Sequence, residues 1–537
     1  MEGLENMAFL SNAVSLVIYF YGYMNFSLTK SATTLTNFMG TSFLLALFGG
    51  FISDTYISRF KTAVVFGLIE VVGFSVLTAQ AYFPQLRPTP CILALPDQRD
   101  QCQAADNIQT GILFLGLYLV AFGTSGVKAA LPTLGADQFD ERDPNHITKL
   151  SSFFNWFLFS FTIGAMFGVT FVVWIATNKG WDWSFGLCTV AVLLAVFFIC
   201  MGNSVYRINV PQGSPLLRIF KVFVVAVKHR KLPVPETAAE LYESPDDGEK
   251  LQRTDQFRFL DLAAVRSSSG KSETWNLCSV TQVEEAKILI RMCPIIISTI
   301  FMNTCLAQLQ TFTIQQGTTM DPNLLGFKVP AASIPFIPLF FMFLMIPVYE
   351  HLFVPLARKF TKIPTGIRNL QRIGVGLVLS GISMGVAGLI ETRRKAVAVE
   401  HNMVNSLEPL PYSLFWLGIQ YAIFGAADMF TLVGLMEFFY AESSLGMKSL
   451  ATAISWSSLA FGYFISTVVV QVVNAASGGW LSSNNLNKDK LDYFYWMLAV
   501  LSVANFGFYL VVASWYKYKN VQKDADRIMS TTEIEQA

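Results

Sequence analysis

Charged residues are what this sequence has least of. Of its 537 residues, 14% are charged and 53% are hydrophobic. Soluble domains carry about 25% charged residues, so this composition argues against a soluble protein. The formal net charge is +1, and no field of one sign therefore favours nucleic acid or an acidic partner.

Cysteine pairs and catalytic sets are lacking as well. The seven cysteines are scattered without a Cys-x-x-Cys pair, which argues against a zinc site or a disulfide framework. Cys91 and Cys102 share a polar loop, where either a disulfide or two separate thiols would fit. No nucleophile–base set or metal-ligand cluster stands out, so we expect neither an enzyme nor a cofactor. No basic segment precedes the first apolar stretch, so no cleavable signal peptide is expected.

Long apolar stretches dominate the chain instead. A helix that crosses a membrane needs about 20 mostly apolar residues. A marginal stretch covers 1–20, and clearer ones lie near 36–55, 62–82, 110–131, 152–175, 183–202, 288–313, 330–350, 372–391, 412–440, 449–474 and 491–516. The sequence therefore predicts an all-α integral membrane protein.

A polar segment divides these stretches into two sets of six. Residues 1–202 are predicted as the first six-helix half, 203–283 as a cytosolic linker, 284–516 as the second half and 517–537 as a cytosolic tail. This layout resembles the major facilitator superfamily, in which two six-helix halves rock about a central site. We therefore predict a secondary transporter.

Lysine and arginine residues predict the orientation, because cytosolic loops carry more of them. With both termini in the cytosol the bias is modest, and Arg393–Lys395 runs against it. The prediction is a multi-pass protein of the plasma membrane whose basic linker faces the cytosol. Ser267–Ser269 in the linker are candidate sites for a regulatory kinase.

Three charged residues form the predicted proton-coupling group. A charge in the bilayer interior costs at least about 2.5–3.5 kcal/mol, so it usually faces a cavity and has a function. Glu2 and Glu5 share one helix face, and Lys128 lies in the fourth span. Carboxylates that face an ammonium group can take up or release a proton when a ligand changes their pairing. A solvated helix start and snorkelling of Lys128 are the open alternatives.

Further acidic residues lie in or beside the spans. Glu437, with Asp428 nine residues before it, is a candidate substrate-binding residue, although its span ends soon after it. We expect Glu70 to be structural. Asp54 follows the second span and precedes Arg59. Asp54 could cap the next helix or pair with a basic group, and we predict that Asp54 and Arg59 gate the transporter by joining the inner ends of helices.

Motifs along the whole chain carry a family resemblance. They are Glu5–Ala13, Thr36–Thr41, Gly49–Asp54, Gly126–Lys128, Gly135–Asp140, Ser152–Phe157, Glu437–Tyr440, Met447–Thr452 and Leu491–Trp496. Together they resemble the plant nitrate/peptide transporter family, within the proton-coupled oligopeptide transporters. The first motif is similar to subfamily 4, whose known members carry abscisic acid, gibberellin or nitrate.

Departures from the family pattern indicate what the site holds. The family's first helix usually reads Glu-x-x-Glu-Arg, followed by tyrosines, whereas Asn6, Phe9 and Leu10 stand at these positions here. Thr162 replaces an asparagine that is frequent in the fifth helix. Each loss removes a group that would pair with a zwitterionic peptide. The resemblance thus implies an apolar cavity with Lys128 as its cation, suited to a monoanionic, largely hydrophobic acid.

Three other residues are weaker candidates for this cavity. Asn303, Gln308 and Trp456 would line it, and packing between helices is the alternative for each. In the family, the Glu-x-x-Glu motif lies part-way along the first helix. The resemblance therefore also implies that the first helix is truncated here to about half its usual length.

The combined prediction is a proton-coupled transporter that imports a small organic anion, with a plant hormone such as abscisic acid or gibberellin as the leading candidate. A low-affinity nitrate transporter and a non-transporting sensor of nitrate or hormone are the alternatives, and dipeptide transport fits less well. The expected partners are the lipid bilayer, protons and the small anion, without a metal or nucleic acid.

Overall fold

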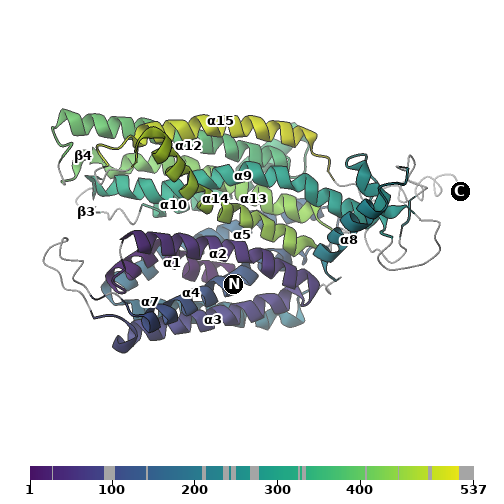
Figure 1. The fold of residues 1–537 in the computed structure, drawn as a ribbon, viewed down its shortest axis with the longest axis horizontal. Helices are drawn as coiled ribbons and strands as arrows, with labels where there is room; N and C mark the ends of the chain where they lie inside the picture. The colour runs from purple at the N-terminus through teal and green to yellow at the C-terminus, as the bar shows by residue number, and fades with distance from the viewer. Residues whose placement is uncertain are drawn as a thin grey trace.

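The computed structural model describes most of the chain as a bundle of long helices (Figure 1). The described residues are 1–26, 28–89, 103, 105–140, 143–208, 213–233, 241–243, 250–265, 277–324, 327–328, 334–405, 408–444, 447–481 and 486–518. Within them, twelve helices are long and apolar enough to cross a membrane. The predicted all-α membrane fold is confirmed.

The spanning helices form two sets in chain order. The first set consists of α1 (Glu2–Gly22), α2 (Leu28–Thr55), α3 (Arg59–Tyr82), α4 (Asn107–Ala136), α5 (His146–Phe167) continued by η3 (Gly168–Val172) and α6 (Val173–Asn178), and α7 (Trp181–Met201). The second set consists of α9 (Val280–Thr318), α10 (Phe336–Val348) continued by η8 (Tyr349–Phe353) and α11 (Val354–Thr361), α12 (Asn369–Glu400), α13 (Leu417–Glu442), α14 (Lys448–Ser477) and α15 (Leu491–Trp515).

The first helix is long enough to cross a membrane. Helix α1 has 21 residues, which corresponds to a rise of roughly 30 Å. It is one of the twelve candidate spans, and it packs against α2, α5 and α7. The residues of the predicted proton-coupling group on α1 therefore lie on a helix held by three neighbours.

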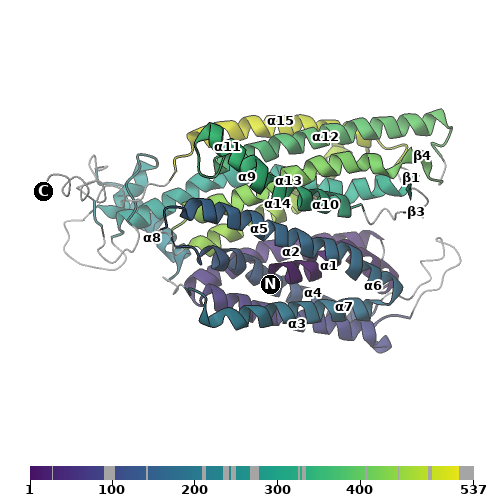
Figure 2. The ribbon, with the colours of Figure 1, turned by 180° about the vertical axis from the view of Figure 1, so that it is seen from behind.

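The two sets lie on opposite sides of the bundle in both views (Figures 1 and 2). They meet along two seams, where α2 packs against α14 and α5 packs against α10. Helix α9 begins at Val280, inside the segment predicted as linker. The division of the chain at 202, 283 and 516 stays a prediction.

Glycines bring helices of the first set into close contact. A Cβ added to Gly123 of α4 would lie 2.5 Å from the Glu70 backbone nitrogen of α3. One added to Gly49 of α2 would lie 2.7 Å from Cα of Gly126 on α4. Small residues allow such backbone approach in membrane bundles. Helices α2, α3 and α4 therefore pack tightly against one another.

The segment between the two sets is partly helical. It contains α8 (Pro215–Lys228) and η6 (Arg258–Ala264), and α8 lies at one end of the bundle (Figure 1). We call this end the linker end. Lys287 of α9 pairs with Asp261 of η6 at 2.6 Å and with Glu284 at 2.8 Å. Arg253 also reaches Asp261, at 2.9 Å, so buried ion pairs fix this segment to α9.

The remaining elements are short. They are η1 (Pro84–Leu86), η4 (Gly202–Ser204), η9 (Leu414–Trp416) and strands β1 (Met320–Asp321), β2 (Asn323–Leu324), β3 (Phe327–Lys328) and β4 (Leu410–Ser413). Strand β1 pairs in parallel with β4, and β2 pairs antiparallel with β3. Cys91, Cys102 and Ser267–Ser269 lie outside the described residues.

Candidate transport site

Glu5 and Lys128 form an ion pair inside the bundle. The Lys128 Nζ lies 3.1 Å from the Glu5 Oε2, and the two side chains are 1% and 0% exposed. Glu5 comes from the first turns of α1 and Lys128 from the last third of α4. The snorkelling alternative does not describe this side chain, because a snorkelling ammonium group would reach the surface.

Three aromatic rings surround the Lys128 ammonium group. Its Nζ lies 4.7 Å from the ring centre of Phe9, 5.4 Å from that of Phe161 and 5.5 Å from that of Trp456. The Trp456 indole N–H also donates to the Lys128 carbonyl oxygen at 3.2 Å. Cations are attracted to the faces of such rings. Because Trp456 belongs to α14, this site joins the two sets of helices.

Two more carboxyl groups lie near this pair. Glu2 is 5% exposed, and in the described part of the chain neither of its oxygens has a hydrogen-bond partner. Glu70 of α3 is 0% exposed and accepts a hydrogen bond from the Thr124 hydroxyl at 2.9 Å. Both interact electrostatically with Lys128. The solvated helix start does not describe Glu2 or Glu5, because both side chains are buried.

Asn6 takes a structural place beside the pair. Its side-chain amide donates to the Phe161 carbonyl oxygen of α5 at 2.9 Å. Helices α1 and α5 approach closely nearby, since a Cβ added to Gly164 would lie 1.9 Å from the Gly3 carbonyl oxygen. Asn6 therefore ties α1 to α5 and adds no charge.

Three other predicted site residues make hydrogen bonds within or between helices. The Asn303 amide donates to the Ser458 hydroxyl at 2.8 Å, and the Gln308 amide donates to the Ser466 hydroxyl at 2.9 Å. Both bonds join α9 to α14. The Thr162 hydroxyl donates to the carbonyl oxygen of Leu158, one turn earlier in α5, at 2.8 Å. The contacts of Asn303 and Gln308 correspond to the packing alternative, and none of the three hydrogen bonds reaches Lys128.

Glu437 lies in a separate polar network. It accepts a hydrogen bond from the Ser151 hydroxyl of α5 at 3.1 Å and pairs with Arg372 of α12 at 3.7 Å. Arg372 also donates to Asn155 of α5 at 2.6 Å, and Asn155 donates to Glu350 at 2.6 Å. The network joins α5 to the second set. One member, Asn155, lies in the Ser152–Phe157 motif singled out in the sequence, but Arg372 and Glu350 were not connected with it.

Asp54 and Arg59 pair with each other in a second network. Arg59 donates to Asp54 at 3.2 Å and also pairs with Asp137. The other Asp54 oxygen accepts from the Leu450 backbone N–H of α14 at 2.8 Å. The Tyr440 hydroxyl of α13 donates to Asp137 at 2.8 Å. This network also joins the two sets of helices, through α13 and α14.

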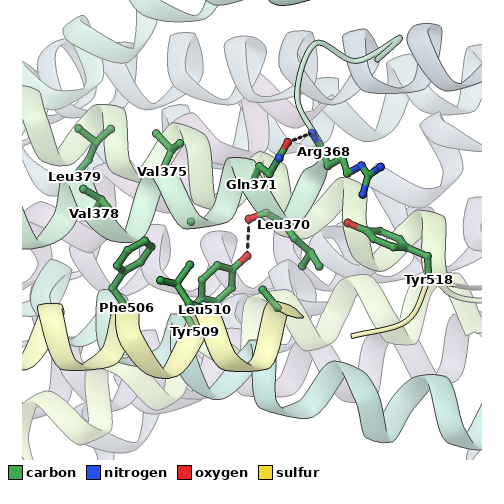
Figure 3. A pocket seen from close by; sticks show the side chains of 12 residues that line it. Arg368, Leu370, Gln371, Val375, Val378, Leu379, Phe506, Tyr509, Leu510 and Tyr518 are labelled. Carbon is green, nitrogen blue, oxygen red and sulfur yellow. Dashed lines mark hydrogen bonds between the residues drawn. The ribbon is translucent and has the colours of Figure 1, made fainter. Parts of the chain in front are cut away.

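A groove of about 490 Å³ lies elsewhere, between α12 and α15 (Figure 3). Figure 3 shows Val375, Val378 and Leu379 facing Phe506 and Leu510 across it, with Arg368 at one end. All of its lining residues belong to these two helices and the segments next to them. It is therefore distinct from the site around Lys128.

Comparison with known proteins identifies the family. The sequence model of the family described as PTR2, POT family, matches residues 60–485 of this chain. The chain belongs to the POT family. Protein NRT1/PTR FAMILY 4.6 of Arabidopsis thaliana is 43% identical to it, over 97% of this chain and 93% of that protein. Protein NRT1/PTR FAMILY 8.1 of the same plant is 40% identical, over 96% and 92%. The resemblance predicted from the motifs is confirmed.

Solved structures of POT family transporters share the fold. The crystal structure of the POT family transporter PepTSo has a TM-score of 0.61 at 16% identity, over 96% of this chain and 97% of that one. A POT family transporter in complex with 5-aminolevulinic acid has a TM-score of 0.60 at 11% identity, over 95% and 94%. The protein is thus a multi-pass membrane transporter of the POT family and not an enzyme.

Proposed function

We propose that the chain imports a small organic anion together with protons, and that Lys128 binds the anion. The observation that carries this proposal is the buried Glu5–Lys128 pair inside its ring of aromatic side chains. An ammonium group in such a place can hold a carboxylate, while the rings pack against apolar parts of the same molecule. Proton coupling is general in the POT family, which supports the same assignment.

The coupling follows from charge balance. In the absence of substrate, the Glu5 carboxylate neutralises Lys128 at 3.1 Å. A substrate carboxylate that binds Lys128 displaces Glu5, and Glu5 is then a buried carboxylate without a cation. Such a charge is costly, so Glu5 binds a proton. Glu2, one turn before Glu5, extends this site and takes part in the same exchange.

The two polar networks between the halves serve as a gate. Arg59 with Asp54 and Arg372 with Glu437 lie in networks that tie the first set of helices to α12, α13 and α14. A rocking motion that opens the site toward the linker end has to break these contacts. On this account Glu437 controls the conformation of the transporter, whereas the substrate contacts Lys128.

The substrate class follows from what surrounds Lys128. Phe9, Phe161 and Trp456 supply apolar surface, and Asn6 adds no second cation. A monoanionic hydrophobic acid uses one cation and this surface. Nitrate would use only the cation, and a dipeptide would need a partner for its amino group. Abscisic acid and gibberellin are therefore the leading candidates, as the likeness to subfamily 4 also suggests.

A competition assay tests the substrate class. Cells that express the chain are given labelled abscisic acid at acidic external pH, with an excess of unlabelled abscisic acid, gibberellin, nitrate or a dipeptide. We expect the two hormones to reduce uptake and nitrate and the dipeptide to leave it unchanged. Inhibition by nitrate alone would favour the nitrate transporter, and labelled hormone that binds without entering the cell would favour the sensor.

A further inference from the structure

Glu70 is a buried carboxyl group to which the proposed transport cycle gives no role. It lies on α3 with 0% of its surface exposed. Its Oε1 accepts the hydrogen bond from Thr124 at 2.9 Å, and in the described residues its Oε2 has no hydrogen-bond partner. An ionised carboxylate that is buried with one satisfied oxygen is strongly destabilised. The group therefore needs either a cation or a proton.

The cation near Glu70 is already engaged. Lys128 follows Thr124 by one turn of α4, so the two side chains lie on one face of that helix. Lys128 pairs with Glu5 at 3.1 Å, which leaves Glu70 without a balancing charge in this cluster. Glu2 and Glu5 of α1 are the other carboxyl groups that interact electrostatically with Glu70, and among the described residues the Cys188 thiol of α7 interacts with it as well.

Thr124 suits both protonation states of Glu70. A hydroxyl group can donate a hydrogen bond to a carboxylate, and it can accept one from a protonated carboxyl group. A lysine or arginine in its place would favour the ionised form alone. The position is also rigid, because Gly123 lets the backbones of α3 and α4 approach at Glu70 itself.

We propose that Glu70, together with Thr124, is a second proton-binding site of this transporter, apart from the Glu5–Lys128 pair. Glu70 holds a proton while Glu5 neutralises Lys128. When Glu5 leaves Lys128, the two carboxyl groups compete for protons as a coupled pair. The inference rests on the proposed proton coupling, to which it adds a residue on α3. It assigns a function to a side chain whose sequence position indicated only structure.

Infrared difference spectroscopy tests the site without knowledge of the substrate. A protonated carboxyl group has a C=O stretching band that an ionised carboxylate lacks. The full chain, reconstituted in lipid vesicles, is compared with Glu70→Gln, which keeps the shape of a protonated carboxyl group. We expect Glu70→Gln to remove one component of this band at neutral pH, and Thr124→Val to shift that component. Glu400→Gln, at an exposed ion pair with Arg393, is the control and should leave the band unchanged.

Two outcomes would overturn the proposal. One is a carboxyl band that is the same in Glu70→Gln and in the unmodified chain. The other is unfolding of both Glu70→Gln and Glu70→Asp. Because Glu70→Asp keeps an ionisable group, its unfolding would show that Glu70 has a structural role and that the lost band reports unfolding. If the proposed function were wrong, uptake of the organic anion would not depend on Glu5 or Lys128. The infrared difference between Glu70→Gln and the unmodified chain would still be observed.

Discussion

At the scale of single residues, the burial of Lys128 is made possible by its neighbours. An isolated ammonium group in the bilayer interior is costly. Here Glu5 supplies a carboxylate at 3.1 Å, and three rings lie within 5.5 Å of Nζ. Trp456 has a second role, because its N–H satisfies the Lys128 carbonyl oxygen. The site thus depends on residues from α1, α4, α5 and α14 together.

We predict that Trp456→Leu weakens substrate binding. The change removes a ring close to the ammonium group and the donor to the Lys128 carbonyl oxygen, and a desolvated cation–ring contact contributes up to about 2 kcal/mol. The KM for uptake should therefore rise by roughly tenfold. Trp456→Phe, which keeps a ring, should have a smaller effect. Trp183→Leu, at an exposed position of α7, serves as the control. Equal KM values for Trp456→Leu and the unmodified chain would contradict this role.

Sequence reasoning reached some of these residues and not others. Glu5 and Lys128 were predictable because a charge in a long apolar stretch is rare and its cost demands a partner. Asn303 and Gln308 were ambiguous, since a polar residue in a span can face a cavity or a neighbouring helix. The sequence of one helix does not determine how that helix is rotated about its axis within the bundle. Phe161 was missed because aromatic residues are common in every span.

At the scale of elements, ion pairs explain why Arg393–Lys395 runs against the orientation rule. The Arg394 guanidinium donates twice to Glu391, at 2.7 Å each, and both side chains are fully buried. Lys395 pairs with Asp492 of α15 at 2.8 Å. These charges are neutralised within the second set of helices. Their position in the sequence is therefore a weak guide to the side of the membrane.

The α3–α4 contact gives a prediction about stability. Gly123→Ala places a methyl group 2.5 Å from the Glu70 backbone, so the two helices must separate. Overpacking of this kind costs about 1–3 kcal/mol. We expect a lower melting temperature for the purified chain in a thermal unfolding assay.

Gly111→Ala is the matched control for that change. It lies on the same helix, and an added Cβ would meet nothing within 4 Å. Alanine is a better helix former than glycine by about 1 kcal/mol, so Gly111→Ala should leave the melting temperature unchanged or raise it. Equal melting temperatures for the two variants would argue against close packing at Gly123.

At the scale of the whole molecule, the two sets of helices are joined by three kinds of contact. Helices pack directly along the seams of α2 with α14 and of α5 with α10, ion pairs and hydrogen bonds connect the networks of Arg59 and Arg372, and cation–ring contacts surround Lys128. The number of membrane-spanning helices and their division into two sets were predictable, because the length of each apolar stretch and of the polar segment between the sets can be read from the sequence. The pairing of helices across the bundle was not, because the faces that meet lipid and the faces that meet helices are both apolar.

The central claim is that the Glu5–Lys128 pair couples protons to uptake of an organic anion. The most direct measurement compares uptake of labelled abscisic acid at acidic and neutral external pH in cells that express the chain or its variants. The unmodified chain and Lys61→Ala, an exposed position, should take up more at acidic pH. Glu5→Gln and Lys128→Ala should lose that dependence, provided that both reach the membrane in normal amounts. Uptake in these two variants that still rises at acidic pH, as in the unmodified chain, would contradict the claim.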